Sequence, residues 1–275
     1  MLYAVGAQIP EYRVRAFNNA SDSTNLIHAD EHARRYGYRG GLVPGVSIFA
    51  YMSRSLVDFL GRAWLERGSA DVRFLHPIYD GEEVRVSGSL AAVGKDGTLR
   101  IECQALNALG VTCARGTAEL PPEAPCPEPA RSDYPAGRSG TRRTIALETL
   151  EIGELLEPIS EHFDWKGHWE YCQKEIRDHH PLYGHLAHPG WLLTRANRIL
   201  AANYDLPPWI HVGSMVQHYR ALENEGTIET RGRVIDRFER KGHHFIVLDV
   251  ALFGDAGCLA TVRHTAIFSI APRAA

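Results

Sequence analysis

The sequence lacks any long hydrophobic run. The longest, Leu42 to Met52, is interrupted by Pro44 and Gly45. It falls well short of the about 18 apolar residues that a membrane-spanning helix requires. The N-terminal stretch has neither the basic segment nor the apolar core of a secretory signal. We therefore expect no membrane segment and a cytoplasmic location.

Cysteine is sparse and no sign of charge dominates. The five cysteines are never spaced as Cys-x-x-Cys, which argues against a disulfide framework and against a zinc knuckle. They are Cys103, Cys113, Cys126, Cys172 and Cys258. The formal net charge of -3 provides no electrostatic attraction for nucleic acid. Nucleic acid is accordingly not an expected partner.

An internal repeat is the strongest feature that is present. The segment "VPGVSIFAYMSRSL" at 43–56 resembles "HPGWLLTRANRIL" at 188–200. Three pairs of positions keep nearly the same separation: Gly45 and Gly190 at 145, Val72 and Val216 at 144, Gly88 and Gly232 at 144. A constant offset over this length indicates two copies of one structural unit.

Each copy places an apolar helix after Pro-Gly and then four runs rich in β-branched residues. The predicted helices are 46–60 and 191–203, and the predicted strands are 72–78, 82–93, 98–108, 111–120, 214–222, 227–238, 244–253 and 258–270. The pattern predicts an α+β fold in which each central helix is wrapped by an antiparallel sheet. Joining the two halves into one continuous sheet would hide two open edges.

The boundary between the halves is rich in proline. Residues 120–140 carry six prolines, which excludes a central strand or a regular helix there. The sequence therefore predicts an N-terminal half at 1–120, a linker at 121–144 and a C-terminal half at 145–275.

Residues 25–49, "NLIHADEHARRYGYRGGLVPGVSIF", resemble the signature of MaoC-like R-specific enoyl-CoA hydratases and dehydratases. The resemblance implies a double hot-dog fold with the working site in the N-terminal half. In such enzymes a histidine and an aspartate hold one water, and a backbone N–H at the start of the central helix binds the thioester oxygen. By position, His28 matches the histidine and Gly45 matches the helix-start glycine.

The aspartate of the resembled family lies five residues before the histidine, where this chain has Ser23. Asp22 lies one residue earlier and could take the same place through a loop insertion. The alternative is that Ser23 and Asn25 orient the water instead, with altered or lost hydration. An ordinary packed role for His28 also stays open.

Glycine near the start of the first central helix suits close approach of a ligand to the backbone. We expect Gly41, Gly45 and Val46 to lie on the oxyanion and substrate side of the site, because unpaired N–H groups and the positive dipole end of a helix stabilise an oxyanion.

The second copy reads "RDHHPLYGHLAHPGW" at 177–191. It keeps an aspartate at Asp178, has Tyr183 in place of the histidine and shortens the connecting segment. We therefore interpret the C-terminal half as degenerate. Its histidines between 162 and 188 match no familiar metal-site spacing, so no metal site is predicted.

The resemblance implies a lyase that hydrates or dehydrates an acyl thioester carried by CoA or by an acyl carrier protein. No metal and no other cofactor is expected, and a homodimer is left open. The alternatives are a catalytically altered or inactive hot-dog acyl-thioester binding protein and, less favoured, a hot-dog thioesterase. Hot-dog thioesterases commonly carry a carboxylate on or beside the central helix, whereas residues 46–57 and 191–204 contain no Asp or Glu.

Overall fold

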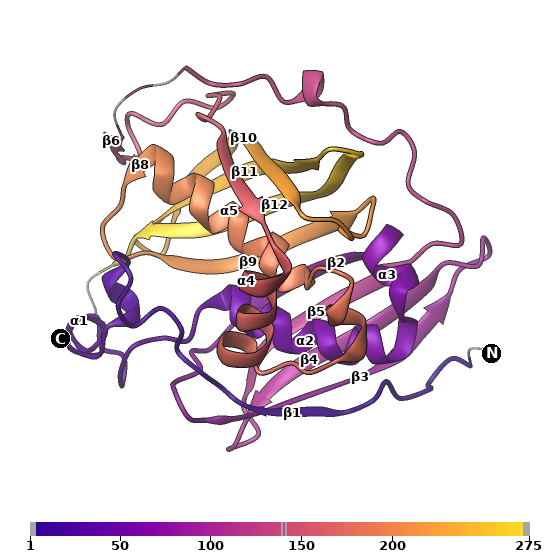
Figure 1. Ribbon diagram of the computed structural model, residues 1–275. Coiled ribbons are helices and arrows are strands. Elements are labelled where there is room, and N and C mark those ends of the chain that lie inside the picture. The colour runs from indigo at the N-terminus through magenta and orange to yellow at the C-terminus, as the bar shows by residue number, and fades with distance from the viewer. Residues whose placement is uncertain (1–3, 139, 141, 272–275) are drawn as a thin grey trace.

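A computed structural model describes residues 4–138, 140 and 142–271 of the chain. It has one ten-stranded antiparallel sheet in the order β1-β3-β4-β5-β2-β9-β12-β11-β10-β7 (Figure 1). The strands are β1 Tyr12–Arg15, β2 Ser69–Phe74, β3 Glu83–Val93, β4 Leu99–Asn107, β5 Thr112–Leu120, β7 Ile159–Phe163, β9 Ile210–His218, β10 Gly226–Arg240, β11 His243–Gly254 and β12 Gly257–Ser269.

The two halves join through the antiparallel pair β2 and β9 at the middle of this sheet. Ala70 pairs with Val216, and Val72 pairs with Ser214. Val72 and Val216 are equivalent positions of the sequence repeat. The joint is therefore formed by the equivalent strands of the two copies. Backbone hydrogen bonds across the joint satisfy the edge that each half would otherwise expose.

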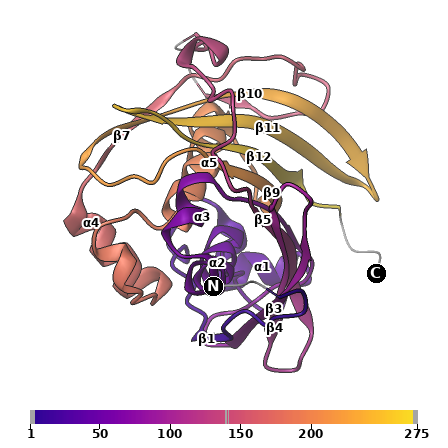
Figure 2. The same cartoon turned by 90° about the vertical axis from the view of Figure 1, so that its right-hand side faces the viewer.

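Two long helices, α2 (Gly45–Leu60) and α5 (Pro189–Asn203), lie together on the concave side of the sheet (Figure 2). Most residues of α2 are buried, including Phe49, Tyr51 and Leu56. One apolar cluster includes side chains from both helices and from strands of both halves. The halves therefore share a core.

The remaining elements are short. They are η1 Leu26–His28, α1 Asp30–Arg35, α3 Arg62–Arg67, η2 Arg131–Asp133, α4 Trp165–Glu170, the π-helical turn η3 Tyr171–Ile176, η4 Pro181–Gly184, and the parallel pair β6 Arg143–Thr144 with β8 Tyr204–Asp205. Gly37, with φ of 79°, follows α1 and permits the left-handed turn that ends it. None of the helices in the described part of the chain combines the length and hydrophobicity of a bilayer crossing.

The predicted double hot-dog architecture is confirmed, with both central helices on one continuous sheet. All eight predicted strands are present, although the first strand of each copy begins and ends earlier than predicted: β2 ends at Phe74 and β9 ends at His218. The edge strands β1 and β7 were not predicted. The division into 1–120, 121–144 and 145–275 stays a prediction, and its outermost residues, 1–3 and 272–275, lie outside the described residues.

Candidate active site

His28 is the last residue of η1, and its hydrogen bonds define its tautomer. Nδ1 lies 2.7 Å from the carbonyl oxygen of Leu42, which can only accept, so Nδ1 carries the proton. Nε2 therefore carries a lone pair, and the Asn25 side-chain amide donates to it at 3.3 Å. Burial lowers the pKa of His28, opposed by the bond to Leu42. The imidazole is thus neutral at physiological pH.

Asn25 is held by a residue of the other half. Its Nδ2 donates to the Trp209 carbonyl at 3.0 Å, and its Oδ1 accepts from the Trp209 N–H at 3.1 Å. These two bonds fix which end of the amide faces His28. Although the two residues are 184 positions apart, Trp209 orients the group beside the His28 lone pair.

Gly41 and Asn18 fix the backbone of His28. Asn18 donates a side-chain hydrogen bond to the His28 carbonyl at 2.8 Å. A Cβ atom at Gly41 would lie 2.0 Å from the same oxygen, closer than any real contact. Gly41 is therefore required for the close approach of two backbone segments, and it acts by positioning His28.

The N-terminus of α2 begins beside this histidine. Pro44 precedes the helix, and its carbonyl accepts from Ser47 and Ile48 at 2.9 and 3.2 Å. Among the hydrogen bonds of the described residues, none is made by the N–H groups of Gly45 and Val46. Two unpaired donors at the positive end of a sixteen-residue helix can bind an anionic oxygen.

The N-terminus of α5 is capped by a side chain. Nδ1 of His188 accepts from the Gly190 N–H at 3.0 Å, and Nε2 of His188 donates to Asp178 at 3.3 Å. Asp178 also binds Arg54 of α2 at 2.7 Å. Burial alone would raise the pKa of Asp178, but His188 and Arg54 outweigh it and lower the pKa. This carboxylate links the two halves through its ion pair with Arg54, and the interpretation of the second site as degenerate stays a prediction.

Two cavities meet at His28. The smaller, of about 250 Å³, includes the apolar side chains of Leu42, Ile48 and Val212 in its lining. The larger, of about 500 Å³, is more polar and includes Glu161 and Arg195. The residues that line both are Asn25, His28, Pro44, Asn197 and Trp209.

The residues predicted for the site are only partly brought together. Gly45 lines the smaller cavity, whereas Val46 and Ser23 line the larger one. Ser23 Oγ donates to the Asn25 carbonyl at 3.4 Å. Asp22 is exposed, lines neither cavity and forms no hydrogen bond or ion pair within the described residues. Asn25, rather than a carboxylate, is the side chain next to Nε2 of His28.

Sequence reasoning missed the residues that the C-terminal half contributes. Asn197 lies in α5, and Trp209 precedes β9. His211, in β9, lines the smaller cavity, and its Nδ1 would lie 3.0 Å from a Cβ at Gly45. Burial lowers the pKa of His211 well below its usual value, and His264 adds to the effect. The sequence repeat predicted a helix at 191–203, but it could not show which side chains of that helix lie near His28.

Of the histidines between 162 and 188, His168 and His188 have structural contacts: His188 caps α5 and His168 packs beside it. His168 Nε2 accepts from the His188 N–H at 2.8 Å and lies 3.5 Å from Cys172 Sγ. Burial, then His188 and Arg195, lowers the pKa of His168 to about 3. Within the described ranges, no group of three or more His, Cys, Asp or Glu side chains is arranged to hold a metal ion.

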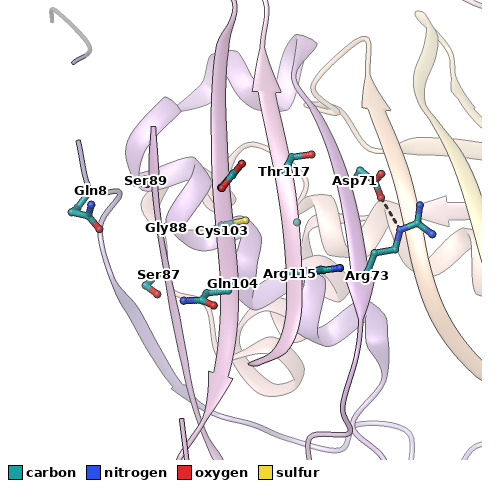
Figure 3. A pocket seen from close by; sticks show the side chains of 12 residues that line it. Gln8, Asp71, Arg73, Ser87, Gly88, Ser89, Cys103, Gln104, Arg115 and Thr117 are labelled. Carbon is teal, nitrogen blue, oxygen red and sulfur yellow. Dashed lines mark ion pairs between the residues drawn. The ribbon is translucent and has the colours of Figure 1, made fainter. Parts of the chain in front are cut away.

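A further hollow, of about 630 Å³, lies on the strands of the N-terminal half (Figure 3). Arg73 and Asp71 form an ion pair across 3.2 Å there. Arg115 lies beside Arg73, and Gln104 lies beyond Arg115 (Figure 3). Its described lining includes no histidine and shares no residue with the two cavities at His28. The catalytic candidates therefore lie on the helix side of the sheet.

Several solved structures have a similar fold. A proposed MaoC domain dehydratase from Chloroflexus aurantiacus has a TM-score of 0.71 at 11% identity, over 98% of this chain and 96% of that chain. A conserved hypothetical protein from Mycobacterium tuberculosis with a double hot-dog fold has a TM-score of 0.62 at 13% identity, over 96% of each chain. A proposed oleoyl thioesterase from Lactobacillus plantarum has a TM-score of 0.56 at 9% identity, over 97% of each chain.

These likenesses show a double hot-dog fold, and they confirm the expected resemblance to MaoC-like dehydratases at the level of the fold. Their identities are too low to transfer an activity. No family model matches the sequence, and a search of curated proteins gives no match. Proteins of this fold include both dehydratases and thioesterases, so the function has to be argued from the site.

Proposed function

We propose that the protein is a hydratase or dehydratase that interconverts 2-enoyl and 3-hydroxyacyl thioesters of CoA or of an acyl carrier protein. The observation that carries the proposal is a neutral imidazole, with its Nε2 lone pair at the junction of two cavities, beside a helix N-terminus with two unpaired N–H groups. A base and an oxyanion donor are what the addition of water to a conjugated thioester requires.

In the direction of hydration, His28 Nε2 takes a proton from water while the hydroxyl oxygen bonds to C3. The electrons of the C2–C3 double bond move toward the thioester oxygen, which Gly45 or Val46 N–H stabilises. The His28 imidazolium then returns its proton to C2, so that no external acid is consumed. The smaller cavity, with Leu42, Ile48 and Val212 in its lining, suits the acyl group. The larger cavity, with Glu161 and Arg195, suits the carrier arm.

One observation favours a second candidate, an acyl-thioester binding protein without lyase activity. The Asn25 amide N–H already points at Nε2 of His28, where it competes with water for the lone pair. A thioesterase is the third candidate because structures described as thioesterases share the fold. The three differ in product: a hydroxyacyl thioester, none, or a free thiol.

A panel of 2-enoyl-CoA substrates of increasing chain length tests the proposal. Hydration should be seen as loss of enoyl absorbance without release of thiol. Replacing His28 by Ala should lower kcat by roughly 10²-fold or more, and His28→Gln serves if the alanine variant folds poorly. The matched control is His32→Ala, since His32 lies on α1 and lines neither cavity.

Full activity in folded His28→Ala would contradict the assignment of His28 as the base. Wild-type protein that binds the thioesters without changing them would instead favour the binding protein. Thiol release by the wild type that His28→Ala abolishes would favour the thioesterase.

A further inference from the structure

Asn197 lies in the middle of α5, and it is the α5 residue that lines both cavities at His28. Its side-chain amide forms no hydrogen bond with any other described residue, and its Oδ1 is buried. A buried amide oxygen without a partner costs about 1 to 3 kcal/mol. Such a group at a cavity junction indicates that a ligand or a water completes its hydrogen bonding.

A bound water can complete the hydrogen bonding of Asn197. No direct hydrogen bond joins Asn197 to His28 or Asn25, although all three side chains line the same two cavities. A bound water needs two to four polar partners. Such a water would take the place of the Asn25 amide at the His28 lone pair, and the Asn197 oxygen would accept its second hydrogen.

Some other polar side chains of the larger cavity already have hydrogen-bond partners. Thr194 donates to the Gly190 carbonyl at 2.9 Å, and Ser47 donates to Asn19 at 3.2 Å. Arg195 donates to the Trp191 carbonyl at 2.7 Å and pairs with Glu161 at 3.2 Å. Tyr171 Oη and His168 Nδ1 of the larger cavity and His211 Nδ1 of the smaller one are also buried without a hydrogen-bond partner. Each of these lines one cavity alone, whereas Asn197 lines both.

We propose that Asn197 Oδ1 binds and orients the water whose proton His28 accepts, so that the C-terminal half completes the active site of the N-terminal half. This inference rests on the proposed function. It assigns to a neutral amide from α5 the orienting role that the resembled enzymes give to a carboxylate near the histidine. An amide cannot take the proton, so that role stays with His28.

The test uses two near-isosteric variants. Asn197→Leu removes the acceptor and should lower kcat roughly 10- to 100-fold, as expected for a misplaced reactant, with little change in KM. Because it also removes an unpartnered buried amide, it should leave Tm unchanged or raise it. A purely structural role would lower Tm together with activity. Asn197→Asp keeps an acceptor oxygen and should recover most of the loss in kcat.

A crystal structure with butanoyl-CoA, which has no double bond to hydrate, gives a readout independent of turnover. We expect a water within hydrogen-bond distance of both His28 Nε2 and Asn197 Oδ1. Absence of that water, wild-type kcat in Asn197→Leu, or a fall in Tm that parallels the fall in kcat would each overturn the inference.

Different results would contradict the proposed lyase activity and the proposed role of Asn197. Hydration by the wild type that Asn197→Leu does not slow overturns the role of Asn197 alone. The bound water together with thiol release, in place of hydration, overturns the proposed lyase but supports Asn197 as the residue that holds the water. Failure of the wild type to bind any thioester overturns both.

Discussion

At the scale of single residues, the side chain next to the basic nitrogen of His28 is that of Asn25. It donates into the Nε2 lone pair, which favours the neutral ring. Asn25→Asp would replace that donor by a carboxylate that stabilises the imidazolium, so the pKa of His28 should rise. Titration of the His28 ring protons by NMR measures the change. Asp22→Asn is the control, because exposed Asp22 lines neither cavity, and an unchanged pKa in Asn25→Asp would contradict the site geometry.

The local sequence shows some residues of the site and conceals others. His28 and Gly45 stand in a continuous segment whose spacing resembles a known signature, so reading along the chain predicts them. Asn197 and Trp209 meet His28 and Asn25 only because α5 packs on α2 and because β9 pairs with β2. Nothing in the residues around Asn197 distinguishes it from an ordinary helix-surface amide.

At the scale of elements, the segment between η1 and α2 is held by the close approach of Gly41 to His28. Gly41→Ala would place a methyl group 2.0 Å from the His28 carbonyl oxygen. The backbone must then shift, which should lower the free energy of unfolding by about 1 to 3 kcal/mol and displace His28. Urea unfolding and kcat of the same sample measure both effects.

Gly184→Ala is the matched control for that variant. A Cβ at Gly184 would meet nothing within 4 Å, so stability and activity should stay close to wild type. Equal behaviour of the two alanine variants would show that the segment can relax around Gly41 without moving the histidine.

The long helices and central strands are predictable because their apolar periodicity persists over many residues. The edge strands β1 and β7 are not predictable in this way. They have only four and five residues, too few to show a clear alternation of apolar and polar side chains. They form strands because neighbouring β3 and β10 offer backbone partners, which is a tertiary effect. The first strands of the two copies end early for a similar reason: β2 and β9 stop pairing with each other at Arg73 and Gln217 respectively.

At the scale of the whole molecule, several histidines are buried in neutral form. Burial lowers the pKa of His218 to about 4 and that of His264 to about 3, and burial with nearby charges lowers that of His168 to about 3. In the unfolded chain these groups titrate near pH 6.5. Below that pH the unfolded chain binds more protons than the folded one, so stability decreases as the pH falls.

Between pH 7 and pH 5, each of these three histidines should cost about 1 to 2 kcal/mol of unfolding free energy. Urea unfolding at the two pH values checks this. His218→Phe removes one of these titratable groups and should therefore lose less stability on acidification. Phe suits the position because His218 packs against Trp64 at 5.2 Å between ring centroids and neither of its ring nitrogens has a hydrogen-bond partner in the described structure. An equal loss in the variant would contradict the burial of a neutral ring.

The joint between β2 and β9 limits how the chain can be divided. A fragment that ends before the linker would expose the outer backbone groups of Ser69–Phe74 and the flank of α2 that now contacts α5. Such an edge is a template for pairing with another chain. The halves are therefore two copies of one motif but not interchangeable modules: truncation libraries and gene fusions that separate them would yield self-associating fragments, whereas insertions into the proline-rich connection would leave both halves in place.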